Sequence, residues 1–191
     1  MKDKKKILLI LVAFIAVLLV AQLGYQLLQP RVNAPALQEM PSIGDMAADS
    51  SDPAAEHAPD FTVYDASGNS VTLTELMGKP LVLNFWASWC GPCKGEMPDF
   101  EAVYQEYGDK VTFVMVNLTG GRETQESAQS YVEGKGYTFP VYFDIDGDAA
   151  ATYSVSGIPA TYIIDADGAL VAHSVGAISG DELRKALDGL L

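Results

Sequence analysis

The sequence has few basic residues once its first six positions are passed. Its 191 residues include 12 Lys and Arg against 25 Asp and Glu, for a net charge of −13. The first six residues contribute +3 to that total, which leaves −16 on the rest of the chain. No cluster of Lys and Arg follows Lys6, and nucleic-acid binding requires one. The composition therefore excludes a nucleic-acid-binding protein. No internal repeat is evident.

Cysteine is also scarce, because Cys90 and Cys93 are the only two in the chain. None lies near the N-terminus, which excludes a lipid-modified N-terminal cysteine. A purely structural disulfide is one alternative for an exported protein. Such a bridge would close a loop of four residues, which removes little chain entropy and stabilises the fold weakly. We therefore interpret the pair as reactive.

Polar side chains are absent from Ile7 to Ala21, and the apolar character continues to Leu28. The whole run has the length of a membrane-spanning helix, and the lysines before it predict an N-inside, C-outside orientation. An uncleaved anchor is favoured, with a removed signal peptide as the alternative. The next stretch is rich in Pro, Ala, Ser and Asp without periodicity. The N-terminal part thus divides into a basic cytoplasmic leader (1–6), a transmembrane anchor (7–28) and a flexible linker (29–57).

A strand and a helix are predicted to meet at the two cysteines. The apolar run Leu81–Trp86 predicts a buried strand, and the stretch from Pro92 to about Tyr107 predicts a helix whose first turn suits a proline. Cys90 would lie just outside the helix N-terminus, where free N–H groups and the helix dipole lower a thiol pKa and favour the thiolate. Cys93, one turn further, would be close enough to form a disulfide with Cys90 and to resolve a mixed disulfide.

Strands and helices alternate over residues 58–191, which predicts an α/β domain with a central mixed sheet flanked by helices. Turn residues predict two hairpins, at 65–70 and 165–168. Ser179 and Glu182 form a capping box that begins the last helix. The other expected elements are strands at 61–64, 71–73, 111–118, 141–143, 160–164 and 169–175, and helices at 74–77, 122–135 and 149–153.

Two motifs resemble thioredoxin: Trp89-Cys90-Gly91-Pro92-Cys93 behind a strand, and Gly157-Ile158-Pro159 before one. The resemblance extends to the membrane-anchored, extracytoplasmic thioredoxin-like proteins of the TlpA/ResA type, in the AhpC/TSA-redoxin-like branch of the thioredoxin superfamily. It covers the chain from about Ala58 to the C-terminus. The helix-strand unit at 122–143 resembles the insertion of that branch. The resemblance implies a thioredoxin-like fold.

One departure from thioredoxin is informative. Thioredoxin has a buried Asp six residues before its first cysteine, where this chain has Asn84, which cannot titrate. The TlpA/ResA branch instead places a carboxylate three residues after the second cysteine, and Glu96 matches that position. On the helix, Glu96 would share a face with Cys93. We hypothesise that Glu96 transfers a proton to and from Cys93; the alternative is an ordinary solvated glutamate.

The resemblance implies a thiol-disulfide oxidoreductase that uses no cofactor beyond the Cys90–Cys93 disulfide and no metal. Cys90, Cys93 and Glu96 are its expected catalytic residues. Cys90 would attack a substrate disulfide and Cys93 would release the reduced product. Pro159 resembles the family's cis-proline, beside which the Ile158 backbone would pair with an extended substrate strand. The expected substrate-binding residues are Trp89, which would cover one side of the site, Gly91, Pro92, Ile158 and Pro159, while Trp86 is assigned to the core.

The direction of the reaction depends on the reduction potential. The Gly-Pro dipeptide between the cysteines is that of thioredoxin and favours a protein-disulfide reductase over a disulfide-forming oxidant. A reductase outside the cytoplasm requires electrons from inside, which implies a membrane electron-donor protein as a partner. The substrates would be protein disulfides, and the resemblance suggests apocytochrome c, in cytochrome c maturation, as one candidate.

Two other interpretations use the same cysteines, and a third concerns an acidic run elsewhere in the chain. A thiol peroxidase would need Thr or Ser three residues before Cys90, where Ala87 stands. A non-enzymatic Cu(I)-binding module could use the two thiolates but would need a nearby His or Met; His173 is expected on a different strand, and the direction of Met97 is open. The acidic run 144–148 resembles a calcium-binding loop only loosely, and a turn with an Asp cap explains it better.

Overall fold

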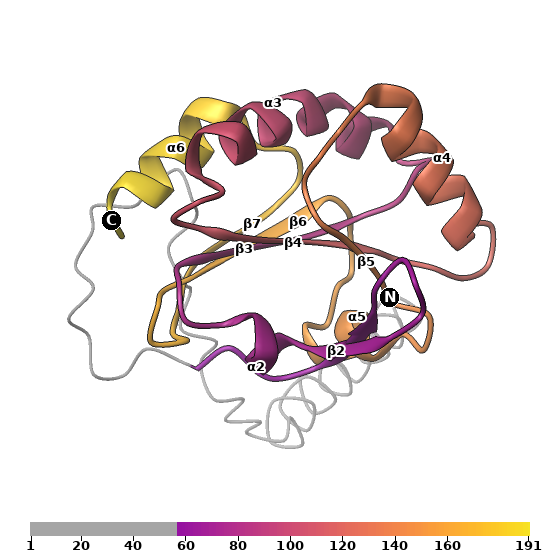
Figure 1. The fold of residues 1–191 in the computed structure, drawn as a ribbon, viewed down its shortest axis with the longest axis horizontal. Helices are drawn as coiled ribbons and strands as arrows, with labels where there is room; N and C mark the ends of the chain where they lie inside the picture. The colour runs from indigo at the N-terminus through magenta and orange to yellow at the C-terminus, as the bar shows by residue number, and fades with distance from the viewer. Residues whose placement is uncertain (1–56) are drawn as a thin grey trace, which may run out of the picture. The chain divides into compact units, whose positions relative to one another are not determined.

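The computed structural model describes residues 57–191, which fold around one seven-stranded mixed sheet (Figure 1). Its strand order is β2-β1-β5-β4-β3-β6-β7, with β3, β4 and β5 parallel and the other pairs antiparallel. The strands are β1 (Thr62–Tyr64), β2 (Ser70–Thr72), β3 (Leu81–Trp86), β4 (Thr112–Asn117), β5 (Val141–Phe143), β6 (Ala160–Ile164) and β7 (Leu170–Val175). The helices are α2 (Leu73–Leu76), α3 (Gly91–Tyr107), α4 (Gln125–Lys135), α5 (Asp148–Thr152) and α6 (Gly180–Asp188). The predicted α/β class with a mixed sheet is confirmed.

The central strand β3 has the bounds predicted from its apolar run, and every residue in it is buried. It pairs in parallel with β4, and α3 connects the two, as the sequence predicted. On its other side β3 pairs with β6, in a register that places Asn84 opposite Thr161. The C-terminal end of β3 therefore leads directly into Cys90, beside a strand that brings polar side chains from far along the chain.

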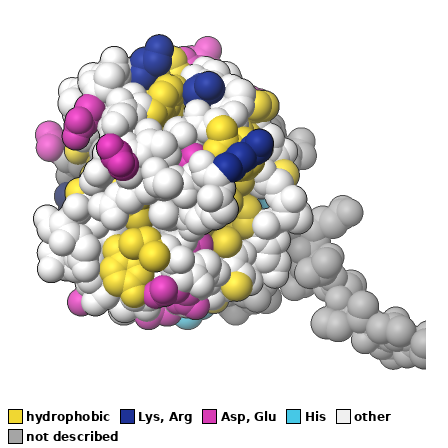
Figure 2. Space-filling model, turned by 90° about the vertical axis from the view of Figure 1, so that its right-hand side faces the viewer, with side chains coloured by type: hydrophobic (Ala, Val, Ile, Leu, Met, Phe, Trp, Pro, Cys, Tyr) yellow, Lys and Arg dark blue, Asp and Glu magenta, His cyan; other side chains and the backbone are white. Residues whose placement is uncertain are grey.

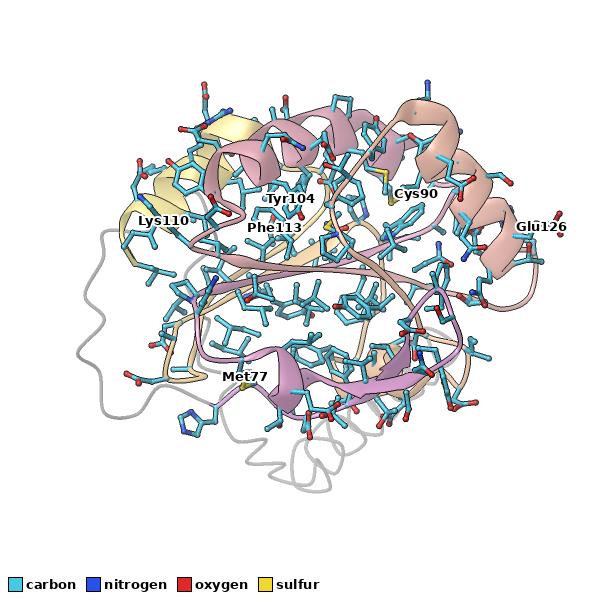
Figure 3. The ribbon with its side chains drawn as sticks, in the orientation of Figure 1. Met77, Cys90, Tyr104, Lys110, Phe113 and Glu126 are labelled. Atoms are coloured by element: carbon cyan, nitrogen blue, oxygen red, sulfur yellow. A yellow bond between two sulfur atoms is a disulfide. The ribbon has the colours of Figure 1, made fainter. Side chains whose placement is uncertain are left out.

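Helices cover both faces of the sheet (Figure 1). The larger apolar cluster includes Trp86, Phe100, Val132 and Leu187, and it packs α3, α4 and α6 onto one face. The smaller cluster includes Phe61, Phe85 and Tyr153. It lies on the other face of the sheet, between the central strands and the layer that contains α2, α5 and the β1–β2 hairpin. Figure 3 shows the two layers of side chains above and below the strands. Both cysteines belong to the larger cluster, on the α3 side of the sheet.

The predicted helix at 122–135 is wrong at its start. The structure begins α4 at Gln125, because the Thr124 side chain accepts a hydrogen bond from the backbone N–H of Ser127 and caps the helix. Gly120 and Glu123 form an isolated β-bridge just before it. Arg122 and Glu123 therefore lie in the loop between β4 and α4 (residues 118–124, the insertion loop) rather than on a helix.

The predicted capping box at the last helix is confirmed: the Ser179 hydroxyl accepts from the Glu182 N–H, and the Glu182 carboxylate accepts from the Ser179 N–H. Among residues 57–191, no helix is both long and apolar enough to cross a membrane. The predicted leader and anchor, and all of the predicted linker except His57, lie outside the described residues.

Candidate active site

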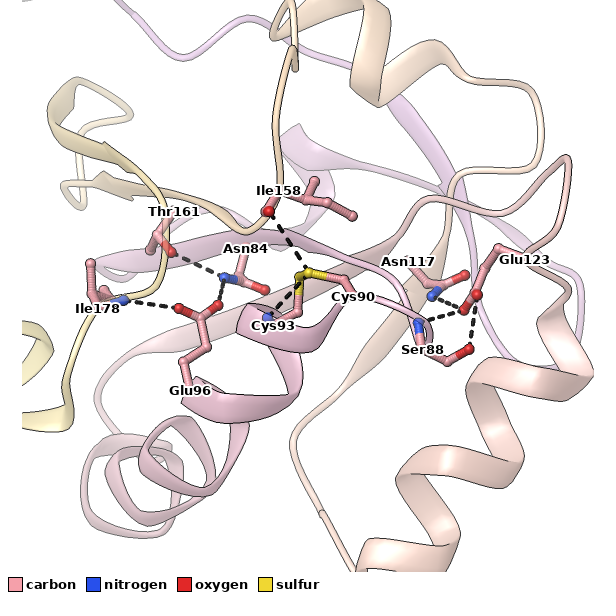
Figure 4. Close-up of a disulfide and its surroundings, with 10 residues drawn as sticks. All are labelled: Asn84, Ser88, Cys90, Cys93, Glu96, Asn117, Glu123, Ile158, Thr161 and Ile178. Carbon is pink, nitrogen blue, oxygen red and sulfur yellow. Dashed lines mark hydrogen bonds between the residues drawn. A yellow bond between two sulfur atoms is a disulfide. The ribbon is translucent and has the colours of Figure 1, made fainter.

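The two cysteines lie at the start of α3, where they form a disulfide (Figure 4). Cys90 is the N-cap residue, and its Sγ accepts a hydrogen bond of 3.2 Å from the backbone N–H of Cys93. This is the helix N-terminus that the sequence predicted, and it favours a thiolate at Cys90 in the reduced form. Cys90 is 4% exposed and Cys93 is 0% exposed. Of the two cysteines, only Cys90 thus retains any contact with solvent.

The loop before β6 lies against the disulfide. The Ile158–Pro159 peptide bond is cis, as the resemblance implied. The carbonyl oxygen of Ile158 lies 3.7 Å from Cys90 Sγ. A disulfide sulfur has no proton to donate, so this contact is van der Waals packing in the oxidised form. Within residues 57–191, no backbone hydrogen bond uses the N–H or C=O of Ile158, which leaves both groups available to an extended peptide.

Glu96 is not a solvated helix residue, since only 3% of it is exposed. Its Oε1 accepts from Asn84 Nδ2 at 2.9 Å and its Oε2 accepts from the backbone N–H of Ile178 at 3.0 Å (Figure 4). Burial disfavours the charged form more strongly than these bonds favour it, and it raises the pKa of Glu96 to about 7. The carboxyl group one turn beyond Cys93 can therefore gain or lose a proton near neutral pH.

Asn84 occupies the position where thioredoxin has a buried Asp. It is fully buried, and its Nδ2 also donates to Thr161 Oγ1 at 3.0 Å. Its Oδ1 is buried without a hydrogen-bond partner among the described residues. Asn84 therefore fixes the Glu96 carboxylate from the strand side, while its amide oxygen is left without a donor.

Sequence reasoning missed a second buried carboxylate, that of Glu123 in the insertion loop, which is 2% exposed. Its Oε1 accepts from the backbone N–H of Ser88 at 2.9 Å and from Asn117 Nδ2 at 2.8 Å. Its Oε2 accepts from Ser88 Oγ at 2.8 Å. No spacing pattern marked this residue, because it stands in a polar stretch with Gly and Thr neighbours. The carboxylate ties the insertion loop to the segment just before Cys90.

The expected substrate-binding residues Trp89, Gly91 and Pro92 are exposed beside Cys90, with Trp89 at 44%. The Arg122 guanidinium lies 3.6 Å from the centre of the Trp89 ring, a cation–π contact that the sequence did not predict. Trp86, by contrast, is fully buried in the core, as expected.

The residues of the alternative interpretations lie elsewhere or have structural partners. His173 is on β7 opposite Tyr162, and the two rings stack. Met97 is buried in the larger core cluster. The expected Asp cap is wrong in its position, because the N-cap residue of α5 is Gly147 and it makes no side-chain cap hydrogen bond. Asp144, three residues before it, accepts from the backbone N–H groups of Ala149 and Ala150 in the first turn, and burial raises its pKa. In the described part of the chain, no three His, Cys, Asp or Glu side chains gather to hold a metal ion.

Comparison with known proteins agrees with this geometry. The AhpC/TSA family matches residues 54–173. The thioredoxin-like protein YneN of Bacillus subtilis is 37% identical over 133 residues, which cover 70% of this chain and 78% of YneN. The thiol-disulfide oxidoreductase ResA of Bacillus thuringiensis is 35% identical over 136 residues, 71% of this chain and 75% of ResA.

Among solved structures, a secreted disulfide oxidoreductase of Mycobacterium tuberculosis, described as homologous to E. coli DsbE, is 33% identical. It superposes with a TM-score of 0.58 and covers 67% of this chain and 95% of its own. The sequence and structural similarities thus point to the same group of enzymes.

Proposed function

Since the chain belongs to the AhpC/TSA family and is a thiol-disulfide oxidoreductase of the thioredoxin type, we propose that it reduces protein disulfides outside the cytoplasm through Cys90 and Cys93. The observation that carries this proposal is the position of Cys90: it caps α3, accepts the Cys93 N–H and retains solvent contact. A thiolate at such a site is stabilised at neutral pH and can attack an approaching disulfide.

The reaction has two exchange steps. The Cys90 thiolate attacks one sulfur of the substrate disulfide, which forms a mixed disulfide and releases the other substrate sulfur as a thiolate that takes up a proton. Cys93 then attacks Cys90 Sγ, which releases the second substrate sulfur and leaves the Cys90–Cys93 disulfide. The substrate disulfide is reduced by two electrons and the enzyme dithiol is oxidised by two.

Glu96 is proposed to hold the proton of the second step. Cys93 is fully buried, so its thiol has no direct contact with water. Glu96, one turn along the same helix and with a pKa of about 7, is present in both protonation states near neutral pH. Its carboxylate would accept the Cys93 proton, which creates the attacking thiolate, and the resulting acid would return that proton when the dithiol forms again.

Substrate binding is proposed to use Trp89, Gly91, Pro92, Ile158 and Pro159. The unpaired N–H and C=O groups of Ile158 would bond an extended strand of the substrate. Trp89 and Pro92 would contact its side chains on the open side of Cys90.

A reducing direction and an extracytoplasmic location rest on the sequence. The Gly-Pro dipeptide is that of thioredoxin, and the apolar segment at 7–28 with its basic leader would anchor the domain outside the membrane. A membrane protein would then supply electrons to the Cys90–Cys93 disulfide. Apocytochrome c is the candidate substrate that the TlpA/ResA resemblance supports.

The test is reduction of insulin by the full chain in the presence of dithiothreitol, together with the dithiol potential against glutathione. We expect rapid insulin reduction that the Cys90→Ser variant lacks. We also expect a potential near or below about −250 mV; a value near about −120 mV would assign an oxidant instead. A Cys93→Ser variant should accumulate the mixed disulfide with substrate. Insulin reduction by Cys90→Ser at the parent rate would disprove the dithiol mechanism.

A further inference from the structure

The rim of the candidate active site differs in charge from the rest of the domain. Residues 57–191 carry 7 Lys and Arg against 19 Asp and Glu. Two of the seven lie at the motif: Lys94 is exposed directly after Cys93, and Arg122 is exposed over Trp89, next to Cys90. Figure 2, which views one end of the molecule, shows Lys and Arg beside hydrophobic side chains in its upper half, with most acidic groups toward the left and lower edges.

Arg122 is held in place from two directions. Its guanidinium stacks on the Trp89 ring at 3.6 Å. The next residue, Glu123, is buried and accepts three hydrogen bonds, two from Ser88 and one from Asn117. Two consecutive residues of the insertion loop, Arg122 and Glu123, therefore contact two consecutive residues just before Cys90: Trp89 and Ser88, respectively. The loop cannot move without breaking bonds to that segment.

The outer side of Arg122 remains available to a ligand. Among residues 57–191, no carboxylate lies within 4.0 Å of its guanidinium, whereas Arg184 pairs with both Glu106 and Asp181. A planar guanidinium on an aromatic ring keeps its N–H groups at the edge, where they suit a carboxylate, and the ring reduces the entropy that binding would cost. An exposed Arg and Trp together are also typical of strong contact residues in interfaces.

We propose that Arg122, stacked on Trp89 and fixed through Glu123, binds a carboxylate of the substrate in the residue next to the cysteine that Cys90 attacks. The inference rests on the proposed reductase function and specifies its substrate class: protein disulfides with an acidic neighbour. Arg122 is a substrate-binding residue and Glu123 is a positioning residue, because it acts through the insertion loop.

The proposed preference for an acidic substrate is the opposite of the preference that the net charge of the domain would produce. An excess of 12 negative charges in residues 57–191 favours a basic substrate through long-range attraction. A local preference for an acidic substrate must therefore come from the basic rim, and removal of Arg122 should expose the opposite preference of the whole domain.

The test uses three synthetic peptides, each closed by one disulfide and identical except that Glu, Gln or Lys precedes both cysteines. The kcat/KM for their reduction by the full chain is measured with dithiothreitol as electron source. We expect the Glu peptide to be reduced about fivefold faster than the Lys peptide, with the ratio falling at high salt. In Arg122→Ala the order should reverse, and in Arg122→Lys the preference should be partly retained, because the charge remains but the stacked fork is lost.

Matched variants separate recognition from folding. Arg184→Ala removes an arginine near the other end of α3 and should leave the peptide ratio unchanged. Glu123→Ala should lower the ratio toward that of Arg122→Ala. Glu123→Gln should keep it, because an amide oxygen can accept from the Ser88 N–H and Asn117 while its nitrogen donates to the Ser88 hydroxyl.

The outcomes distinguish this inference from the proposed function. Equal rates for the three peptides, a faster Lys peptide with the parent chain, or an unchanged ratio in Arg122→Ala overturns the role of Arg122 and leaves the reductase intact. Failure to reduce either insulin or any of the peptides overturns the reductase, and the substrate class with it.

Discussion

Two buried glutamates lie on opposite sides of the disulfide in the view of Figure 4, and they differ in what holds them. Glu96 is 3% exposed and accepts two hydrogen bonds, from Asn84 and Ile178. Glu123 is 2% exposed and accepts three, from Ser88 and Asn117. In residues 57–191 no Lys or Arg forms a salt bridge with either. Equal burial therefore does not mean an equal role: we assign proton transfer to the first and loop positioning to the second.

The largest expected effect separates these roles by one substitution made at both positions. Glu96→Gln removes the proton carrier, and we expect kcat for insulin reduction at pH 7 to fall about a hundredfold. The fold should survive, since the Asn84 amide can turn so that its unpartnered Oδ1 accepts from the new amide. Glu123→Gln should retain nearly the parent rate. Equal losses in the two variants, or rates of Glu96→Gln that match the parent from pH 6 to pH 9, would end the distinction.

The second prediction concerns stability and pH. The pKa of Glu96 is raised from 4.5 to about 7, so between these values the folded chain holds a proton that the unfolded chain has released. The free energy of unfolding should therefore fall by about 3 kcal/mol through this group as pH rises from 4 to 8. Urea unfolding of the full chain at several pH values, compared with Glu96→Gln, isolates the contribution. The variant should lose less stability over that range, and parallel curves would contradict the assignment.

Removal of the other carboxylate is the third test. Glu123→Ala leaves the Ser88 N–H, the Ser88 hydroxyl and the Asn117 amide without their acceptor, and we expect unfolding at pH 7 to become easier by about 2–3 kcal/mol. Glu123→Gln, which can satisfy all three groups, should cost less than about 1 kcal/mol. If alanine were tolerated as well as glutamine, the hydrogen bonds would not be what holds the insertion loop.

The smallest expected effect tests the link between Asn84 and Glu96. Asn84→Ala removes a hydrogen bond that favours the Glu96 carboxylate, so the pKa of Glu96 should rise further, by about one unit. The midpoint of the pH–rate profile for insulin reduction should move upward by the same amount. Thr161→Val, which touches only the second N–H of the Asn84 amide, serves as the control. If the midpoint of the pH–rate profile did not move in Asn84→Ala, the hydrogen bond from Asn84 would not be what lowers the pKa of Glu96.

Much of the fold could be predicted because local patterns were unambiguous. The apolar run Leu81–Trp86 gave a strand with the observed bounds, and Pro92 marked the first turn of α3. The start of α4, the helix that ends at Lys135, was predicted too early. The polar stretch containing Arg122 and Glu123 has no apolar periodicity that would mark where the loop ends and the helix begins. Only the Thr124 cap fixes that boundary in the structure.

The candidate site could be predicted in part. The cysteines, Glu96 and the Ile158–Pro159 loop were found from spacing and resemblance, but the burial of Glu96 was not, and Glu123 was missed entirely. A glutamate's sequence neighbours do not reveal whether distant elements will cover it. Arg122 was missed for the same reason, since its contact with Trp89 joins positions in two separate loops.

The sequence by itself determined the chemistry of this protein: two thiols one helical turn apart, at the start of a helix that follows a buried strand. Local hydrogen bonding and backbone preference are sufficient for that arrangement. Tertiary structure decided which carboxylates surround the thiols and which groups hold them. The donors to Glu96 lie 12 and 82 residues away, and Ser88 lies 35 residues from Glu123. Desolvation and long-range hydrogen bonds arise only when those segments pack together, and they give the two glutamates different surroundings.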